Sequence, residues 1–393
     1  MNAIFLMCFW DSNLNQAKAN FEKTNAKTFY RYYLLLNSKR GSSMNFVTLV
    51  REQPDIVRNY HSFGCNLLSR KGTVEQIVVS KGEEATALDR FYKALQTAHG
   101  AIVGPWYRPP IDPHHWQSAK NLQVFSGTFD NRFANWIDIE ALTSRGITVI
   151  DTSRGMTPSV AEFALAMTLN LIRHIPESLY ATQNGDWRGD ATWNHPDFVY
   201  GDLTGRQVGL AGFGSINRRY AELLEPFQCT VQSYDPFVAD HVLDNHNIRR
   251  SESLVELAEK SEIFVVGLPP VPTTLEIINR EVISALPKGA LFVLVTRMAV
   301  VEQEPLWERI RANELAAAID VFDPEPPPKN AWFRRHPNVL VTPHIAGGTD
   351  FCHRRCFTHA CQDTLSVIKG QQPTFQATQW DQLCYAGQLK SEQ

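Results

Sequence analysis

One short stretch of the sequence narrows the choice of fold more than any other part of the chain. Residues 207–211 are small and apolar (Gln-Val-Gly-Leu-Ala), which is typical of a strand buried on both faces of a parallel sheet. Gly212 and Gly214 follow at once, and residues 218–224 have a helical pattern. The stretch therefore predicts a strand, a tight glycine turn and a helix within a parallel α/β sheet.

The residues of this turn are of the kind that hold a pyrophosphate in dinucleotide-binding folds. Gly212 would make the tight turn, and Gly214 would let the backbone approach the pyrophosphate. Ser215 and Ile216 would offer backbone N–H groups at the positive end of the helix dipole. Asn217 replaces the third glycine of the fingerprint, so we expect weaker helix–strand packing there. The alternative for this segment is a plain strand-turn-helix unit.

An acidic residue at the end of the next strand supports the nucleotide interpretation. Residues 230–234 have strand character, and Asp235 follows them about 20 residues beyond Gly212, where a ribose-binding carboxylate is expected. A carboxylate at this point accepts hydrogen bonds from the adenosine ribose and repels a 2′-phosphate. The sequence therefore predicts NAD rather than NADP, although Asp-Pro is also a common turn dipeptide.

Strand-like and helix-like segments alternate on both sides of this unit, which predicts two α/β regions. A helical stripe of apolar residues from Ser159 to Arg173 predicts a long core helix, and residues 351–370 are also expected to be helical. The expected strands are 46–50, 76–79, 101–103, 122–125, 147–150, 207–211, 230–234, 263–268, 290–295, 316–319 and 338–342.

Composition excludes several classes of protein. The 38 Lys and Arg residues nearly balance 41 Asp and Glu residues, so no basic surface for nucleic acid is expected. The apolar runs are too short to cross a bilayer, and the seven Cys suggest free thiols in a reducing compartment. We therefore expect a cytoplasmic protein. Residues 1–43 are expected to be a poorly ordered extension, with an organelle-targeting peptide as the alternative.

Three downstream segments carry a resemblance to a known family. They read Leu-Val-Thr-Arg at 294–297, Ala-Ile-Asp-Val-Phe-Asp-Pro-Glu-Pro at 318–326, and Val-Thr-Pro-His-Ile-Ala-Gly-Gly-Thr at 341–349. Together with the glycine turn they resemble the D-isomer-specific 2-hydroxyacid dehydrogenases. The resemblance covers about residues 120 to 370, whereas residues 44–120 fit only in general pattern and residues 1–43 do not fit.

The resemblance implies an α/β fold of two Rossmann-like domains with a cleft between them. A doubly wound, NAD-binding domain of residues 151–348 would be inserted into a flavodoxin-like substrate domain of residues 44–150 plus 349–393. The resemblance also implies an oxidoreductase that uses NAD and interconverts a 2-oxo acid and a D-2-hydroxy acid by hydride transfer. Family members are usually homodimers, and the helix that starts at Ser159 is the expected dimer element.

By the same resemblance, Arg297, Glu325 and His344 would form the active site. His344 would be the general acid/base, because an imidazole can exchange a proton near neutral pH. Glu325 would bind its other ring nitrogen, and Arg297 would bind the substrate carboxylate. Formate dehydrogenases of the wider superfamily have glutamine in place of Glu325, which implies a substrate other than formate.

Further site residues follow from the resemblance. Asp320 would bind the nicotinamide carboxamide, and Gly127 lies in a loop whose backbone amides would receive the substrate carboxylate. Met298 stands where the family usually has a glycine after the arginine, so the backbone there is expected to differ. The sequence does not identify the substrate, because its side-chain pocket lies in the region of weakest resemblance.

Two alternatives belong beside this interpretation. The same fold serves NAD(H)-sensing corepressor proteins, in which the nucleotide changes assembly and turnover is small. Residues 352–361 also concentrate three Cys and two His, which brings a zinc site to mind. Their spacing places Cys352, Cys356 and His359 on one face of a helix without the paired motifs of structural zinc sites, so no metal is expected.

Overall fold

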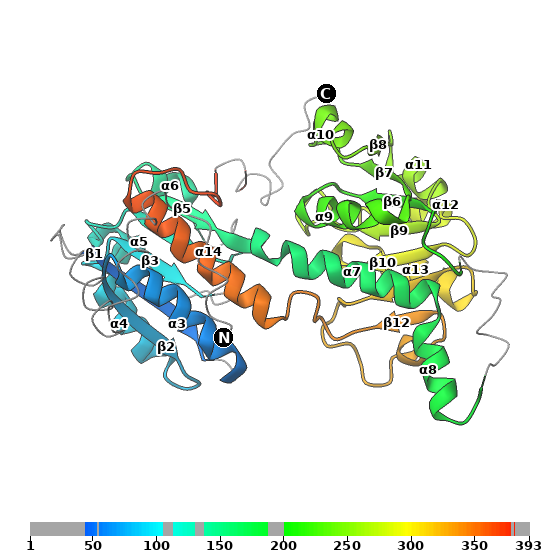
Figure 1. The fold of residues 1–393 in the computed structure, drawn as a ribbon, viewed down its shortest axis with the longest axis horizontal. Coiled ribbons are helices and arrows are strands. Elements are labelled where there is room, and N and C mark those ends of the chain that lie inside the picture. Colours follow the sequence, from blue (N-terminus) through cyan, green and yellow to red (C-terminus); the bar gives the residue numbers. More distant parts are fainter. Residues whose placement is uncertain are drawn as a thin grey trace, which may run out of the picture. The chain divides into compact units, whose positions relative to one another are not determined.

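The structure is a computed structural model. It describes residues 44–52, 55–104, 113–129, 137–187, 200–378 and 381 (Figure 1). The predicted extension of residues 1–43 lies outside the described residues. The described residues form two parallel sheets, one of five strands and one of seven, which confirms the predicted α/β class with two Rossmann-like regions.

The first sheet has the strand order β2-β1-β3-β4-β5, and every strand pair in it is parallel. This is the order of flavodoxin-like sheets. Its strands are β1 (Met44–Arg51), β2 (Gly72–Val79), β3 (Gly100–Val103), β4 (Val124–Gly127) and β5 (Thr148–Asp151), and its helices are α3 (Asp55–Ser69), α4 (Glu84–Leu95), α5 (Pro113–Ser118) and α6 (Ile139–Thr143).

Helix and strand patterns in this region follow from burial. All four residues of β3 and of β4 are buried, as expected for strands covered on both faces. Helix α4 buries Ala87, Phe91 and Leu95, which recur at a spacing of four residues and therefore lie on one face of the helix. These residues join the core above the sheet, so the amphipathic pattern explains the position of the helix.

The second sheet has the order β12-β11-β10-β9-β6-β7-β8, again with parallel pairs throughout. From β6 the chain adds β7 and β8 on one side, and it then returns to add β9 to β12 on the other side. The boundary between β6 and β9 is therefore the switch point at which doubly wound sheets bind ligands. The strands are β6 (Gln207–Ala211), β7 (Thr230–Tyr234), β8 (Arg249–Arg250), β9 (Ile263–Val266), β10 (Leu291–Leu294), β11 (Ala316–Ile319) and β12 (Val339–Val341).

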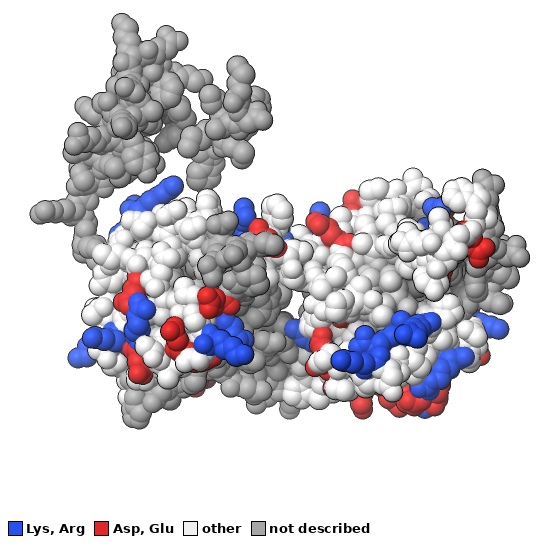
Figure 2. All heavy atoms as spheres, turned by 90° about the horizontal axis from the view of Figure 1, so that it is seen from below, with Lys and Arg blue, Asp and Glu red and all other residues white. Residues whose placement is uncertain are grey.

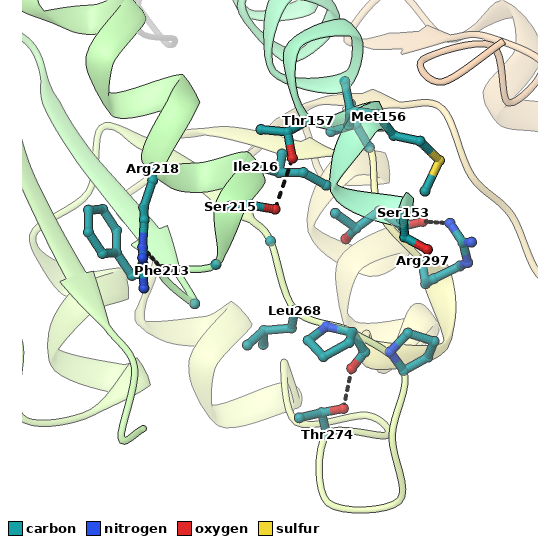
Figure 3. A pocket seen from close by; sticks show the side chains of 18 of the residues that line it. Ser153, Met156, Thr157, Phe213, Ser215, Ile216, Arg218, Leu268, Thr274 and Arg297 are labelled. Atoms are coloured by element: carbon teal, nitrogen blue, oxygen red, sulfur yellow. Dashed lines mark hydrogen bonds between the residues drawn. The ribbon is translucent and has the colours of Figure 1, made fainter. Parts of the chain in front are cut away.

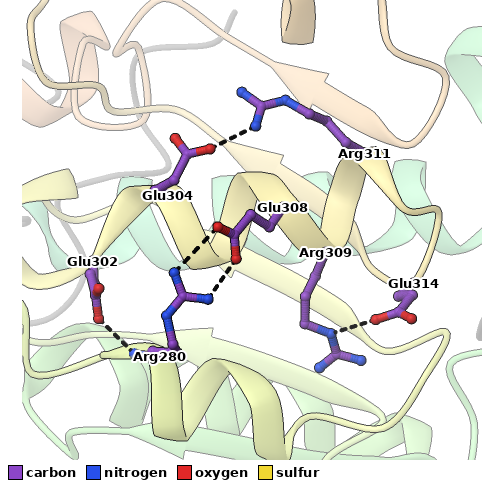
Figure 4. A network of polar contacts seen from close by, with 7 residues as sticks. All are labelled: Arg280, Glu302, Glu304, Glu308, Arg309, Arg311 and Glu314. Atoms are coloured by element: carbon purple, nitrogen blue, oxygen red, sulfur yellow. Dashed lines mark hydrogen bonds and ion pairs between the residues drawn. The ribbon is translucent and has the colours of Figure 1, made fainter.

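Helices pack on this sheet between its strands. They are α9 (Ser215–Leu224), α10 (Asp240–Asp244), α11 (Leu254–Glu259), α12 (Arg280–Ala285) and α13 (Gln303–Arg311). On the surface an ion pair of Arg280 with Glu308 at 2.6 Å joins α12 to α13, and a pair of Arg311 with Glu304 at 2.7 Å lies within α13 (Figure 4). Exposed pairs of this kind contribute about 0–1 kcal/mol each, so the core dominates the stability of this region.

Three further helices connect or flank the two sheets. They are α7 (Thr157–Ile172), which follows the short 3₁₀ helix η2 (Thr152–Met156), then α8 (Ile175–Gln183) and α14 (Asp350–Ile368). The predicted core helix is α7, and the predicted C-terminal helix is α14. Although α14 follows the second sheet in the sequence, it contacts α3, β3, β4 and β5 (Figure 1).

The surface of the described residues carries both signs of charge. In the face shown in Figure 2, basic and acidic side chains are both present, and in several places they lie side by side. Across the described ranges, no helix combines the length and the apolar character that a membrane span requires.

Candidate active site

The carboxyl ends of the second sheet surround a cavity of about 1600 Å³ (Figure 3). This volume exceeds the roughly 300–1,000 Å³ of pockets for drug-sized ligands, so the cavity is large enough for a ligand of dinucleotide size. Seven of the predicted site residues line it, namely Gly212, Gly214, Ser215, Ile216, Asp235, Arg297 and His344. The sequence therefore identified residues from four separate segments that lie around one cavity.

The glycine turn has the backbone that its sequence predicts. Gly212 has φ +84°, a backbone conformation that is strained for any residue with a side chain. An added Cβ would also lie 2.9 Å from Leu268 Cδ2. Gly214 precedes the first residue of α9, and, its two chain neighbours aside, an added Cβ there would meet none of the described residues within 4 Å. Gly214 therefore presents bare backbone to the cavity, next to the N–H groups of the helix N-terminus.

The start of α9 also contacts the start of α7. The hydroxyl of Thr157 donates a hydrogen bond to Ser215 Oγ at 2.9 Å, and both residues line the cavity (Figure 3). Ser153, Arg154 and Met156 line it as well. Our sequence reasoning did not identify this segment. Its position directly after β5, where a parallel strand ends and a helix begins, is a signal that points to a ligand-facing loop.

Asp235 lies directly after β7 with its carboxylate held by backbone amides. Its two oxygens accept hydrogen bonds from the N–H of Phe213 at 2.8 Å and of Phe237 at 2.9 Å. Arg250 supports the same loop by donating to the carbonyl of Asp235 at 2.9 Å. Each carboxylate oxygen has further acceptor capacity, which fits the expected bond to ribose hydroxyls.

His344 and Glu325 form the contact that the family resemblance implied. His344 Nδ1 lies 2.7 Å from Glu325 Oε1, and the two side chains are 37% and 38% exposed. A carboxylate only accepts hydrogen bonds, so Nδ1 is the donor and Nε2 is left to exchange a proton. His344 has φ +55°, a left-handed conformation that costs about 1–2 kcal/mol for a residue with a Cβ. Backbone strain of this kind is concentrated at functional sites.

Asp320 holds the loop that carries His344. The carboxylate is fully buried and accepts three hydrogen bonds, from Thr342 Oγ1 at 2.6 Å, Ile345 N at 3.0 Å and Ala346 N at 2.9 Å. These bonds satisfy the polar groups on both sides of His344 and fix its left-handed backbone. The predicted contact of Asp320 with the nicotinamide carboxamide stays a prediction.

Arg297 follows β10 and lines the cavity. Its Nη1 donates to the carbonyl of Thr296 at 2.7 Å, and its backbone is extended. Met298 is 2% exposed, belongs to the core on this side of the sheet, and is absent from the residues with positive φ. The chain therefore accommodates Met298 by burying its side chain, with no conformation that requires a glycine.

Asn217 fits where helix α9 meets the sheet, because the residue that faces its side chain, Gly267, is a glycine. The Asn217 side chain is buried, and a Cβ added to Gly267 would lie 2.3 Å from its Nδ2. The expected loss of packing at Asn217 is therefore compensated by the room at Gly267. The sequence showed that Asn217 replaces a glycine, but it did not point to Gly267, which lies after β9, three strands beyond β6 in the chain.

Gly127 ends β4 and has a local structural reason to be glycine. An added Cβ would lie 2.4 Å from the ring of Phe129, and the carbonyl of Gly127 accepts a hydrogen bond from Thr152 at 3.0 Å. Residues 130–136, the rest of the predicted substrate loop, lie outside the described residues. Binding of the substrate carboxylate by this loop therefore stays a prediction.

The Cys-rich segment forms part of α14. Cys352, Cys356 and Cys361 are buried free thiols. Burial raises the pKa of the Cys361 thiol well above its ordinary value, and the hydrogen bond that Cys356 donates to Cys352, together with burial, raises the pKa of Cys356. Among the described residues, no three His, Cys, Asp or Glu side chains are grouped as a metal would require.

Comparison with known proteins agrees with the geometry. The family profile described as "D-isomer specific 2-hydroxyacid dehydrogenase, NAD binding domain" matches residues 165–346. A glyoxylate reductase of Thermofilum pendens is 33% identical over 67% of this chain and 77% of its own length. A D-3-phosphoglycerate dehydrogenase of Bacillus subtilis is 30% identical over 60% of this chain and 43% of its own length.

The chain spans only part of the length of several relatives. Its match to the putative 2-hydroxyacid dehydrogenase YoaD of Bacillus subtilis, for example, covers 61% of that protein. Among solved structures, the TT0316 protein of Thermus thermophilus is 27% identical, with a TM-score of 0.62 over 85% of this chain and all of its own. This chain therefore belongs to the D-isomer-specific 2-hydroxyacid dehydrogenase family, which confirms the predicted family.

Proposed function

We propose that this chain interconverts a 2-oxo acid and a D-2-hydroxy acid with NAD as its cofactor. The observation that carries the proposal is the pair of His344 and Glu325, joined at 2.7 Å beside a cavity that also contains Arg297 and the glycine turn. A proton-exchanging group, a planar cation and a nucleotide cradle are the three parts that reduction of a 2-oxo acid requires.

The residues of the cavity fit a nicotinamide dinucleotide. Gly214 adds no side chain of its own to the space next to the N-terminus of α9, and the ten-residue helix behind it offers N–H groups to a pyrophosphate. Asp235 favours NAD over NADP, because its carboxylate would repel a 2′-phosphate. The bound cofactor would supply the hydride for C2 of the substrate.

His344 would hold and release the proton at Nε2. Glu325 accepts the proton of Nδ1, which fixes the tautomer of the imidazole and stabilises its protonated form. During reduction Nε2 would donate a proton to the C2 oxygen, and during oxidation it would accept one. Asp320 orients the loop for both directions, because it binds the two backbone amides that follow His344.

Arg297 would bind the carboxylate and the C2 oxygen of the substrate. Its guanidinium lines the cavity with the imidazole of His344, and a planar guanidinium binds carboxylates through two parallel hydrogen bonds. The substrate would thus be fixed at one end by charge while its C2 oxygen faces the imidazole.

We also propose that residues 44–150 with 349–393 form the substrate domain and residues 151–348 the nucleotide domain. The first sheet ends at Asp151, and α14 packs against α3 and three strands of that sheet, which supports the division. A homodimer belongs to the same proposal, with α7 as the expected dimer element and the next helix in the chain as a further part of the interface. Helix α8 buries none of its residues, and Ile175, Leu179 and Tyr180 are 46%, 56% and 70% exposed. Apolar side chains in this number favour an interface with a second copy of the chain.

The test is oxidation of NADH by the purified protein with glyoxylate, hydroxypyruvate, pyruvate and bulkier 2-oxo acids, followed by absorbance. Turnover of at least one acid is expected, with Arg297→Ala raising the KM for the acid far more than the KM for NADH. NADH binding without turnover of any acid would contradict the proposal and favour the sensing role of corepressor-like proteins.

A further inference from the structure

Asn217 makes a specific contact with the glycine turn that precedes it. Its Nδ2 donates a hydrogen bond to the carbonyl of Gly212 at 2.7 Å and approaches the carbonyl of Ala211 at 3.4 Å. The side chain is 1% exposed, so this bond is made away from water. Gly212 is the residue with φ +84°, which means that the amide of Asn217 binds the turn at its most unusual backbone position.

The space for Asn217 is provided by a second glycine. Gly267 follows β9, the neighbour of β6 at the switch point, and an added Cβ would lie 2.3, 2.4 and 2.6 Å from Nδ2, Cγ and Oδ1 of Asn217. Real Cβ atoms do not approach other atoms so closely, so any other residue at position 267 would displace the amide. The close contact between helix and sheet therefore depends on a glycine at position 267, where the dinucleotide fingerprint would have one at position 217.

The contact has a cost as well. Asn217 Oδ1 is buried and has no hydrogen-bond partner in the part of the chain that the structure describes. Burial of an unpaired carbonyl oxygen is unfavourable, and a side chain without a polar group would avoid it. A residue chosen only to fill this space would be apolar. The donor end of the amide is therefore the part that explains an asparagine here.

We infer that Asn217 is a positioning residue for nucleotide binding. Its amide fixes the carbonyl of Gly212, and thereby the orientation of the peptide groups of the turn that face the cavity. Gly267 is required because only a residue without a side chain leaves room for that amide. The inference rests on the proposed binding of NAD, since it concerns the shape of the turn that would receive the pyrophosphate.

Three variants separate positioning from packing. Asn217→Ala removes the amide, Gly267→Ala displaces it, and Asn217→Gly with Gly267→Ala moves the glycine back to position 217. Gly100→Ala in β3 is the matched control, because its added Cβ would lie 2.7 Å from Thr364 Cγ2, at a site that does not line the cavity. Each protein is measured by thermal unfolding without ligand and by fluorescence titration with NADH.

The inference predicts different results for stability and for affinity. Asn217→Ala and Gly267→Ala should each raise the dissociation constant for NADH about tenfold, the effect of one lost hydrogen bond. The double variant should regain thermal stability relative to Gly267→Ala, because its side chains no longer collide, but should not regain the affinity. Gly100→Ala should lose stability while its affinity for NADH equals that of the wild type.

Two results would overturn the inference. Either Asn217→Ala binds NADH as tightly as the wild type, or the double variant regains affinity together with stability, so that Asn217 only fills space. A wild-type protein that does not bind NADH would instead refute the proposed function, and a coupling between positions 217 and 267 in thermal unfolding would still report their contact. The two failures are therefore distinguishable.

Discussion

Substitution of Asp320 by asparagine tests how the His344 loop is held. Asparagine has almost the same volume, and its oxygen can still accept from Thr342 Oγ1 and Ile345 N. Its NH₂ group, however, would replace the oxygen that now accepts from Ala346 N at 2.9 Å, so two donors would face each other. A hydrogen bond to a charged group contributes about 1.5–3 kcal/mol, and Asp320 is fully buried. We therefore expect the free energy of unfolding to fall by about 3 kcal/mol.

The assay is urea unfolding with linear extrapolation, together with kcat and the affinity for NADH. We expect kcat to fall tenfold or more, because the loop no longer holds His344 in its left-handed conformation. Asp363→Asn is the matched control, since Asp363 is 5% exposed and accepts from Phe375 N at 2.6 Å in the region of the first sheet. It should lose stability without loss of kcat.

An Asp320→Asn protein that matches the wild type in both stability and kcat would refute this account of the loop. A change confined to the affinity for NADH would give a different answer. It would show that Asp320 acts through the nicotinamide carboxamide, as the resemblance implied, and that the loop does not depend on its charge.

Three further predictions concern single residues. His344→Gly should unfold with a free energy about 1 kcal/mol higher than His344→Ala, because glycine adopts φ +55° without strain, and urea unfolding of the two inactive proteins measures this. Asp235→Ala should weaken NADH binding and reduce discrimination against NADPH, and unchanged selectivity in paired titrations would remove Asp235 from its role. Burial lowers the pKa of His61 from 6.5 to about 4, so the folded state resists protonation and stability is lost as pH falls from 6.5 to about 4. The loss is about 3 kcal/mol, and His61→Phe should abolish that part of the pH dependence of urea unfolding.

Most of the fold was predictable because buried parallel strands are continuous apolar runs. Residues 263–266 and 291–294 are entirely apolar and fully buried, and both were expected as strands. The strand that sequence reasoning missed, β8, consists of Arg249 and Arg250. A two-residue strand of long cations has no apolar pattern, and it is defined only by its pairing with β7.

The site was predictable where a motif carries its own geometry. The glycine turn and the contact between His344 and Glu325 follow from local sequence and the family resemblance. The room for the Asn217 side chain was not predictable, because it depends on Gly267, fifty residues further along the chain. Contacts of this kind arise when the sheet brings separate loops together, and a single sequence carries no signal for them.

The central claim is that His344 moves the proton in a reaction that the nucleotide cavity supports. The most direct measurement compares the wild type with His344→Ala in two ways, by NADH titration and by turnover of whichever 2-oxo acid the wild type reduces fastest. Our account predicts equal NADH affinity within about twofold, because His344 is not part of the glycine turn, and a loss of turnover of at least about a hundredfold. Turnover by His344→Ala at the wild-type rate would contradict it.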